Sequence, residues 1–479
     1  MKKSYLTVTD QFCGAGGSSQ GATEAGAEVL MALNHWKLAI DTHQTNFPNA
    51  QHDCTDISAC DPRRYPSTDI LITSPECTNH SLAKGKKIVK AQMELYDNGT
   101  VDAAAERSRA TMWDVPRFAE YHNYNCIIVE NVVDARKWIM FDAWLMAMHS
   151  LGYKHECVYM NSMHCHPTPQ SRDRMYVVFW KAGNKTPDLK ITPDAYCVKC
   201  NTNVRAVQTW KNSSIRFGKY RQQYIYCCPQ CAAVVEPYYY ASFNCIDWSD
   251  IGNRIGDRKK PLSDNTIKRI QFGLDKNEKE PFVIATRYTS GIDCRVKTIT
   301  EPIGTQPGDV SHGIVTPFII KEEHTGNLKN AKRITEALTT HTTRQTMALI
   351  VSNFKSSKSN PVTDAIGTQV TKDKYGICTT DAWNSFIAHV YSNPYYAGMN
   401  KPIGVIRTKH GHELISYSKP KIEDCYYRML KAAEVGRAMA FADDYKVLGT
   451  EKDKVKQYGN AVTPPAMKLL IERCVSSLS

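Results

Sequence analysis

Long apolar runs are missing from this sequence of 479 residues. No stretch of about 18 consecutive apolar residues occurs, so no membrane span is expected. The segment 1–8 passes directly into a predicted strand and lacks the apolar core of a secretory signal peptide. We therefore expect a cytoplasmic protein without a membrane partner, in which most of the 17 cysteines stay reduced and can serve metal binding or catalysis.

Acidic residues are fewer than basic ones, 48 against 60, which gives a formal net charge of +12. A solvated basic surface explains this excess without any partner. A polyanionic partner explains it equally well, because each neutralised phosphate releases counterions. The net charge leaves both explanations open, so the placement of the basic residues has to decide. The length allows one large core and a second, smaller one.

A Gly-Lys-Ser/Thr phosphate loop is absent, but a glycine-rich turn follows the predicted strand 5–9. Helical composition follows at 22–27. Strand, glycine turn and helix form the arrangement in which backbone N–H groups and a helix N-terminus meet a cofactor at the carboxyl edge of a sheet. The candidate cofactor contacts of this turn are Asp10, Phe12, Gly14, Gly16 and Gly17.

Two further segments suit the nucleoside part of a cofactor. The predicted strand 29–33 leads to Asn34 and Trp36, where a side chain can hydrogen-bond a ribose. Asp56 and Ile57 end another short strand-like segment and can contact an adenine edge. Because no phosphate loop is present, an adenosine-containing cofactor is favoured over a phosphate-bearing one.

Reactive side chains stand at the ends of three predicted buried strands. They are Cys77 after 70–72, Glu130 after 127–129, and Arg172 with Arg174 before 175–179. A structural ion pair between Glu130 and one of the arginines is the simpler explanation for these charges. The thiol and the glycine turn in the same chain favour a reacting site instead.

Six motifs, in this order, resemble those of the DNA cytosine-C5 methyltransferase family. They are the glycine turn at 10–21, the loop Pro75 to Ser81, Glu130-Asn131-Val132, Gln170-x-Arg172-x-Arg174, the segment 428–437, and Gln457 to Pro465. The resemblance covers 4–180 and 426–475. The sequence departs from the family at Glu76, Thr78 and His80, where Pro, Gln and Phe are usual, and at Asn34, where an acidic ribose ligand is usual.

The resemblance implies an α/β fold of the class I S-adenosylmethionine-dependent methyltransferases, Rossmann-like, with a mostly parallel seven-stranded sheet. This catalytic domain would comprise 1–182 and 426–479, closed by its C-terminal helix. The family places its target-recognition region between these two parts. We therefore expect 183–425 to form an inserted, β-rich recognition domain.

The chemistry of the family implies a role for each reactive strand end. Cys77 would attack C6 of a cytosine flipped out of double-stranded DNA, which makes C5 able to accept the methyl group of S-adenosylmethionine. Glu130 would assist as a proton donor. Arg172 and Arg174 would hold the base and the Glu130 carboxyl. Three more residues would join the cofactor site: Pro75, Asn460 and Val462.

The segment after Cys77 is strongly basic. A solvated turn accounts for this composition. A loop that closes over the DNA backbone is favoured, because the segment directly follows the predicted nucleophile. Its expected DNA contacts are Ser81, Lys84, Lys86 and Lys87.

The insertion contains two Cys-x-x-Cys pairs: Cys197 with Cys200, and Cys228 with Cys231. Such hairpin turns each present two sulfurs to a tetrahedral Zn²⁺ ion, so a structural zinc ribbon is expected at 195–233. No acidic residue lies between the two pairs, whereas basic and aromatic residues are interleaved there. This composition suits DNA contacts, and a zinc-stapled structural knob is the alternative. The expected DNA contacts are Arg216, Lys219 and Arg221.

An internal repeat follows the cysteine pairs. The pattern Glu-Pro-Ile-Gly-Thr-Gln at 301–306 recurs in looser form at 336–341, 364–369 and 401–406. Because β-rich runs separate the copies, we expect 281–417 to contain β-hairpin-like repeats that share a core.

An enzyme of this kind is expected to act on double-stranded DNA as a monomer, in a prokaryotic or phage-encoded setting at the nucleoid. A restriction endonuclease would be its partner if it belongs to a restriction system. Two alternatives stay open: an RNA cytosine-C5 methyltransferase on the same fold, and a catalytically inactive DNA-binding homologue. The large insertion favours duplex DNA, and the intact Cys77, Glu130 and arginines favour an active enzyme.

Overall fold

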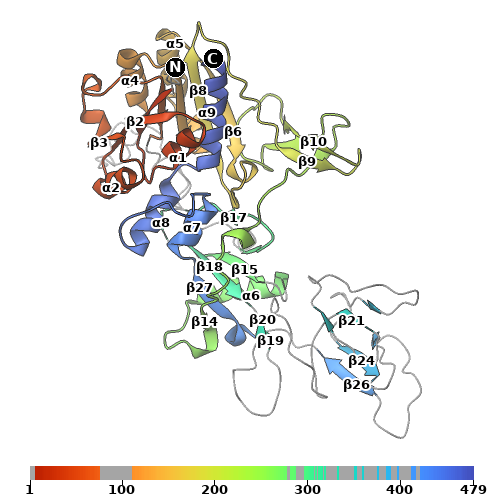
Figure 1. Cartoon of the computed structure of the whole chain (residues 1–479). Helices are drawn as coiled ribbons and strands as arrows, with labels where there is room; N and C mark the ends of the chain where they lie inside the picture. Colours follow the sequence, from red (N-terminus) through yellow and green to blue (C-terminus); the bar gives the residue numbers. More distant parts are fainter. Residues whose placement is uncertain are drawn as a thin grey trace, which may run out of the picture. The chain divides into compact units, whose positions relative to one another are not determined.

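The computed structural model describes residues 6–75, 111–277, 281–286, 296–306, 308–309, 311–316 and 421–478, together with short strands between 318 and 416 (Figure 1). These residues fall into two compact units. The first comprises Met1–Ser249, Ala285–Gly313 and Met429–Ser479, and the second comprises Asp250–Ile284 and Ile314–Arg428.

A seven-stranded sheet forms the centre of the first unit, in the order β3-β2-β1-β4-β5-β8-β6 (Figure 1). Its strands are β1 (Thr7–Gln11), β2 (Glu28–Asn34), β3 (Gln51–Cys54), β4 (Ile70–Thr73), β5 (Cys126–Asn131), β6 (Tyr153–Asn161) and β8 (Asp173–Lys181). The strands from β3 to β5 are parallel, whereas β8 is antiparallel to both β5 and β6. The predicted α/β fold with a mostly parallel seven-stranded sheet is confirmed.

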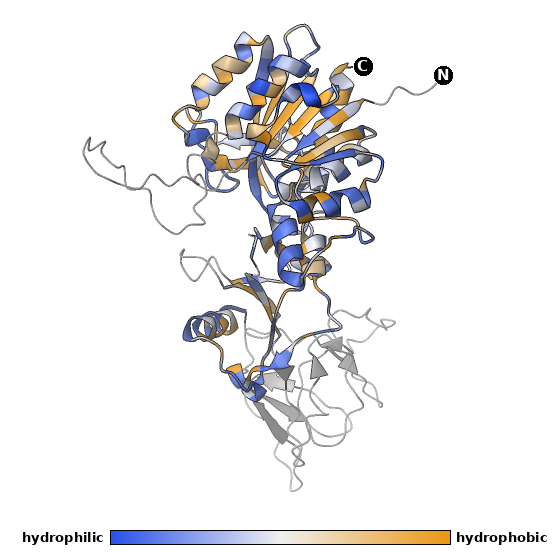
Figure 2. Cartoon of the chain, turned by 90° about the vertical axis from the view of Figure 1, so that its left-hand side faces the viewer, coloured by the Kyte–Doolittle hydropathy of each residue, from blue (hydrophilic) through white to orange (hydrophobic). Residues whose placement is uncertain are grey.

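Neighbouring residues on these strands pack into two different cores. Leu71 and Ile127 belong to a core with α4 (Asp114–His122) and α5 (Phe141–Ser150), whereas Ile70, Ile72 and Ile128 belong to one with α1 (Gly17–Glu24) and α9 (Pro464–Leu478). Successive side chains of a strand point to opposite faces of the sheet. A strand whose two faces are both covered therefore has apolar residues at consecutive positions. Figure 2 shows these strands largely in the orange of apolar residues, whereas the helices around them are mixed in colour.

The last helix completes the second of these cores. A Cβ atom on Gly21 of α1 would lie 2.4 Å from the carbonyl oxygen of Pro464, so α1 and α9 meet at backbone distance. Met467, Leu470 and Ile471 of α9 pack with the sheet. Among the described residues, the remaining α-helices of this unit are α2 (Lys37–Asn46), α7 (Ala432–Ala438) and α8 (Glu451–Asn460).

Five short strands follow the catalytic sheet: β9 (Asp194–Cys197), β10 (Thr202–Arg205), β11 (Val207–Trp210), β12 (Tyr224–Cys227) and β13 (Val234–Val235). β9 pairs with β10, and β11, β12 and β13 form an antiparallel sheet. Tyr220, Tyr224 and Tyr226 lie in the same core as Met175 and Phe179 of the catalytic sheet. These strands belong to the first compact unit, whose first segment continues to Ser249.

The second unit contains α6 (Asp264–Asn277) and a sheet in which β14, β27, β18 and β15 are neighbours in that order. These strands are Asn253–Arg254, Tyr426–Met429, His312–Thr316 and Phe282–Ala285. The described strands between 318 and 416 form three small antiparallel sheets. They are formed by β19 (Phe318–Ile319) with β20 (Lys332–Arg333); β22 (Ser359–Asn360), β21 (Ile350–Ser352) and β23 (Tyr375–Gly376); and β25 (Tyr396–Gly398), β24 (Ser385–His389) and β26 (His412–Ser416).

Of the predicted repeats, only the copy at 301–306 falls within the described residues. Its Ile303–Gly304 forms β17, which pairs in parallel with β7 (Gln170–Ser171). The copies at 336–341, 364–369 and 401–406 lie outside the described residues. Within the described part of the chain, no helix has both the length and the apolar character that a bilayer span requires.

Candidate active site

The strand ends that carry the predicted site lie along one edge of the catalytic sheet. Gln11 of β1 pairs with Thr73 of β4, and Thr73 pairs with Val129 of β5. β1 and β4 therefore end at the same edge of the sheet, just before Phe12 and Ser74. Glu130 lies at this edge as well, near the end of β5. Arg174 lies at this edge too, because the antiparallel β8 begins there. In open α/β sheets the carboxyl edge is where ligands bind.

The glycine turn after β1 has an open side. Phe12, Gly14 and Gly16 all have left-handed backbones, with φ values of 58°, 52° and 87°. This conformation is strained for Phe12, and such strain gathers at functional sites. Among the described residues, a Cβ atom on Gly14 would meet only the Phe12 carbonyl oxygen, at 3.8 Å. A nucleoside can therefore approach this backbone closely.

The other side of the turn is tightly packed. A Cβ atom on Gly16 would lie 2.3 Å from Tyr445 Oη, and one on Gly17 would lie 2.1 Å from the carbonyl oxygen of Val462. The Tyr445 hydroxyl also donates a hydrogen bond to the carbonyl oxygen of Ala15. Both positions therefore require glycine, and the turn is pressed against the C-terminal motif that contains Val462.

A chain of hydrogen bonds links the glycine turn to α2 and β3. Asp10 Oδ2 accepts from Ser18 Oγ at 2.6 Å and from Ser19 Oγ at 2.7 Å. Ser19 Oγ lies 2.8 Å from His43 Nε2, and His43 Nδ1 lies 2.8 Å from His52 Nε2. Because Ser19 gives its proton to Asp10, His43 must donate from Nε2 and accept at Nδ1. Burial raises the pKa of Asp10 to about 6 and lowers the pKa of His43 to about 3.

The predicted nucleoside contacts have fixed orientations. Asn34 Oδ1 accepts a hydrogen bond from the Trp36 N–H at 2.9 Å, and Lys456 Nζ lies 4.4 Å from the centroid of the Trp36 ring. Asp56 is exposed and caps the short helix η1 (Ile57–Ala59), because its Oδ1 accepts from the Ser58 N–H at 3.1 Å. Ile57 is buried.

Pro75 is the last described residue before the predicted nucleophile. Its carbonyl oxygen accepts a hydrogen bond from Asn131 Nδ2 at 3.4 Å, which links the end of β4 to the Glu-Asn motif of β5. The other predicted residues of this loop lie outside the described residues: Cys77, Ser81, Lys84, Lys86 and Lys87.

Glu130 and Arg174 form a nearly buried ion pair at the carboxyl edge. Arg174 Nε lies 2.8 Å from Glu130 Oε1, and the two side chains are 13% and 12% exposed. Arg174 Nη1 also donates to the carbonyl oxygen of Asp173 at 2.8 Å. These contacts hold a carboxyl group and a guanidinium together beside the end of β4.

Arg172 points into a different set of contacts. Its guanidinium donates to the carbonyl oxygens of Gln306 at 3.4 Å, Gly459 at 3.2 Å and Ala461 at 3.2 Å. The last two residues flank Asn460, which is exposed at the end of α8. Arg172 therefore ties the C-terminal motif to the edge of the sheet, a role that the sequence does not indicate.

The order and the placement of these motifs agree with a comparison of the whole sequence. The sequence model of the family described as C-5 cytosine-specific DNA methylase matches residues 6–476. The chain belongs to this family.

The chain is similar, over part of its length, to type II methyltransferases. It is 27% identical over 183 residues to the type II methyltransferase M.HgiDI of Herpetosiphon aurantiacus, which covers 37% of this chain and 53% of the relative. It is 35% identical over 86 residues to M.HgiGI of the same organism, which covers 17% of this chain and 67% of the relative. The methylase chain thus spans about half the length of M.HgiDI. The solved Entamoeba histolytica methyltransferase EhMeth is 12% identical, with a TM-score of 0.45 and full coverage of both chains.

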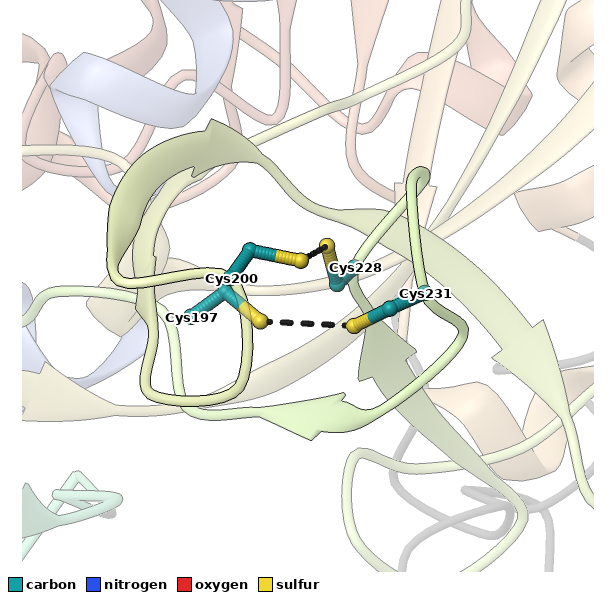
Figure 3. A group of neighbouring side chains, drawn as sticks. All are labelled: Cys197, Cys200, Cys228 and Cys231. Carbon is teal, nitrogen blue, oxygen red and sulfur yellow. Dashed lines mark hydrogen bonds between the residues drawn. The ribbon is translucent and has the colours of Figure 1, made fainter.

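Four cysteine sulfurs of the methylase face one another beside the catalytic sheet (Figure 3). All four lie within 4.8 Å of one another. The Sγ–Sγ distance is 3.5 Å for Cys197 and Cys231, and 3.9 Å for Cys200 and Cys228. A disulfide needs about 2.05 Å. Zn–S bonds of about 2.3 Å place tetrahedral sulfurs about 3.8 Å apart. The two measured distances lie close to this value, and no pair of the four sulfurs is more than 4.8 Å apart.

Two of the three basic residues predicted to contact DNA from this segment are paired with carboxylates. Lys219 Nζ lies 3.0 Å from Asp134 Oδ2. Arg221 Nη2 lies 2.6 Å from Glu236 Oε1, and its guanidinium stacks over the Tyr220 ring. Arg216 is exposed.

Four residues that support this site have no place in the sequence prediction: His43, Asp134, Asp173 and Tyr445. Asp173 stands between the two motif arginines in the sequence, and this position could have indicated that it belongs to the site. No local sequence pattern indicates the role of Tyr445, because its partner Ala15 lies 430 residues away.

Proposed function

We propose that this methylase transfers a methyl group from S-adenosylmethionine to C5 of a cytosine in double-stranded DNA, through a covalent bond between Cys77 and C6. The observation that carries the proposal is the buried Glu130–Arg174 pair, 2.8 Å apart, at the carboxyl edge where β4 leads to Cys77. Membership of the C-5 cytosine-specific DNA methylase family supports the same reaction.

The polar groups at the sheet edge fit an adenosine-containing methyl donor. The open side of Gly14 admits a nucleoside, and exposed Asp56 suits an adenine edge. Among the described residues, the buried Gln11 side chain and Ser74 Oγ have no hydrogen-bond partner, so the edge has polar capacity to spare for a ligand. The proposed holders of the cofactor are Asp10, Phe12, Gly14, Gly16, Gly17, Asn34, Trp36, Asp56, Ile57, Pro75, Asn460 and Val462. When bound, S-adenosylmethionine supplies the methyl group as an electrophile.

The chain's own groups carry the remaining steps. The Cys77 thiolate forms a bond to C6 of the flipped base, and the electron pair of the C5=C6 bond becomes available at C5. Glu130 donates a proton, or a hydrogen bond, at N3 and so lowers the cost of that attack. Arg174 keeps the Glu130 carboxyl in place. After C5 is methylated, loss of the C5 proton restores the C5=C6 bond and releases the Cys77 thiolate.

Three partners complete the proposal. A structural zinc ion would occupy the four-cysteine cluster, because thiolates in tetrahedral order are the ligands of such sites. The loop residues Ser81, Lys84, Lys86 and Lys87 would contact the DNA backbone, as would exposed Arg216. The relatives of the type II class suggest a restriction endonuclease partner in the same system.

Bisulfite sequencing of host DNA after expression tests the reaction and reports its sequence context. Methylation should appear with the wild type and disappear with Cys77→Ser, whereas Cys157→Ala, which removes a half-buried thiol on β6, should preserve it. Persistent methylation with Cys77→Ser would exclude this nucleophile.

Purified protein separates the alternatives. Duplex DNA that contains 5-fluorocytosine should trap the enzyme covalently, because the C5 substituent cannot leave as a proton. Binding without trapping would indicate an inactive DNA-binding homologue. Methyl transfer to tRNA but not to DNA would indicate the RNA enzyme.

A further inference from the structure

The ribbon formed by β9 to β13 docks against the strands that carry the Glu130–Arg174 pair. Lys219 Nζ lies 3.0 Å from Asp134 Oδ2, and the Tyr220 N–H donates to Asp173 Oδ1 at 2.9 Å. Behind these polar contacts, the His164 ring is in edge contact with the rings of Tyr220 and Tyr226, at centroid distances of 4.7 and 5.1 Å.

The two carboxylates that the ribbon holds lie next to the ion pair along the chain. Asp173 directly precedes Arg174, and its own carbonyl oxygen accepts from Arg174 Nη1 at 2.8 Å. Asp134 lies in the short helix η5 (Val133–Lys137), which follows β5 and its terminal Glu130-Asn131. The ribbon thus contacts the residue before Arg174 and the short helix that follows the strand of Glu130.

The cysteine cluster is built into the same ribbon. β12 carries the buried Tyr224 and Tyr226 and leads straight into Cys228. Cys197 ends β9, so the four sulfurs join the β9–β10 hairpin to the β12–β13 hairpin. Such short strands bury little apolar area of their own, and a metal crosslink is the usual means of stabilising units of this size.

We propose that the four-cysteine ribbon is a metal-dependent brace for catalysis: zinc orders the tyrosine face, and Lys219 and Tyr220 then position Asp134, Asp173 and through them the Glu130–Arg174 pair. This inference rests on the proposed methyl transfer and deepens it. It gives Lys219 a positioning role in place of a phosphate contact, because the lysine is already paired with Asp134 and only 28% exposed.

Lys219→Met in the full-length, zinc-loaded protein separates the two roles. For a brace, kcat for methyl transfer falls about two- to fivefold, the range expected for one partly exposed ion pair, whereas the Kd for duplex DNA and its salt dependence stay unchanged. For a phosphate contact, DNA binding weakens and the slope of log K against log salt falls by about one unit. The matched control is Lys185→Met, which removes an exposed charge outside the ribbon.

A double-mutant cycle identifies the partner. Asp134→Asn also breaks the ion pair with Lys137, whose Nζ lies 2.8 Å from Asp134 Oδ1, so it should lower kcat at least as much as Lys219→Met does. Adding Lys219→Met to it should cause little further loss, since the ion pair between the two residues is already broken. Additive effects of the two substitutions on kcat would overturn the assignment.

Metal removal tests the whole brace. The protein as purified should contain about one zinc per chain. Chelation should lower kcat more than tenfold without a comparable change in DNA affinity, and should alter the fluorescence of Trp210, whose ring lies 5.3 Å from that of Tyr224. Added zinc should restore both signals, and Trp210→Phe should remove the fluorescence change. Full activity of metal-free protein would overturn the proposal.

The structural readouts remain informative if the proposed reaction fails. If the zinc-loaded wild type methylates no DNA, two readouts still report whether zinc docks the ribbon. One is the Trp210 fluorescence, and the other is the coupling between Lys219→Met and Asp134→Asn in the free energy of unfolding. Zinc-dependent docking without methylation contradicts only the proposed reaction. Zinc-independent docking contradicts the brace.

Discussion

Arg174 Nε lies 2.8 Å from Glu130 Oε1, and both side chains are nearly buried on neighbouring strands of the sheet. Removing one partner of such a pair leaves a charge in a poorly solvated place, whereas removing both does not. Arg174→Met should therefore destabilise the protein by about 3–5 kcal/mol and abolish methyl transfer. Urea unfolding measures the first effect and bisulfite sequencing the second.

The double variant Glu130→Gln/Arg174→Met serves as the control for this prediction. It should recover part of the lost stability but none of the activity, because the buried charge is gone while the chemistry is not restored. If the double variant is destabilised by the sum of the two single changes, Glu130 and Arg174 are not energetically coupled.

Arg172 should act through the C-terminal motif. Its guanidinium holds the carbonyl oxygens of Gln306, Gly459 and Ala461, which a lysine ammonium cannot reach together. Arg172→Lys should lower the unfolding free energy by about 1–3 kcal/mol and weaken binding of S-adenosylhomocysteine, measured by calorimetric titration. Arg473 of α9 forms an exposed ion pair with Asp188, and Arg473→Lys should change neither the unfolding free energy nor the cofactor binding. Weakened DNA binding with unchanged cofactor binding would instead place Arg172 at the base.

Gly17 should tolerate no side chain. A Cβ atom there would lie 2.1 Å from the carbonyl oxygen of Val462, so α1 and the segment before α9 would have to separate. Gly17→Ala should cost about 1–3 kcal/mol or more and weaken cofactor binding. The control is Gly183→Ala, where no described atom lies within 4 Å of the new carbon. Equal melting temperatures for the two variants would contradict the close packing.

Stability should fall as the pH rises through the titration of Asp10. Burial raises the pKa of this carboxyl from 3.8 to about 6. The folded state therefore binds the proton more tightly than the unfolded state, and the resulting stabilisation is complete below pH 3.8 and lost as the pH rises through about 6. Within that window the loss should approach about 1.4 kcal/mol per pH unit.

Asp10→Asn removes this titration. The difference in unfolding free energy between variant and wild type should move in favour of the variant from pH 4 to pH 7, and then stay constant. Urea unfolding at several pH values measures it. A difference that does not change with pH would mean that Asp10 titrates normally in the folded protein.

Local sequence was enough to predict the elements and the edge of the sheet. The apolar run 70–72 is buried on both faces, and the glycine turn lies between a strand and a helix, because periodicity and backbone freedom are properties of neighbouring residues. The two Cys-x-x-Cys pairs likewise meet, because each pair presents its sulfurs from one tight turn.

Pairings between distant segments could not be predicted in this way. The partners of Arg172, Gly459 and Ala461, lie 287 and 289 residues along the chain. Lys219 pairs with Asp134, 85 residues away. No short pattern records such contacts.

The sequence by itself thus determined which chemical groups this protein has and the strand ends on which they stand. Spacing and local backbone preference act within a few residues, and they suffice for the glycine turn, the buried strands and the cysteine pairs. Only the tertiary structure decided that Glu130 takes Arg174, that Arg172 holds the C-terminal motif, and that the cysteine ribbon packs on the catalytic sheet. These contacts depend on which buried charges and aromatic rings can be paired at the same time. The packing of the whole core determines that.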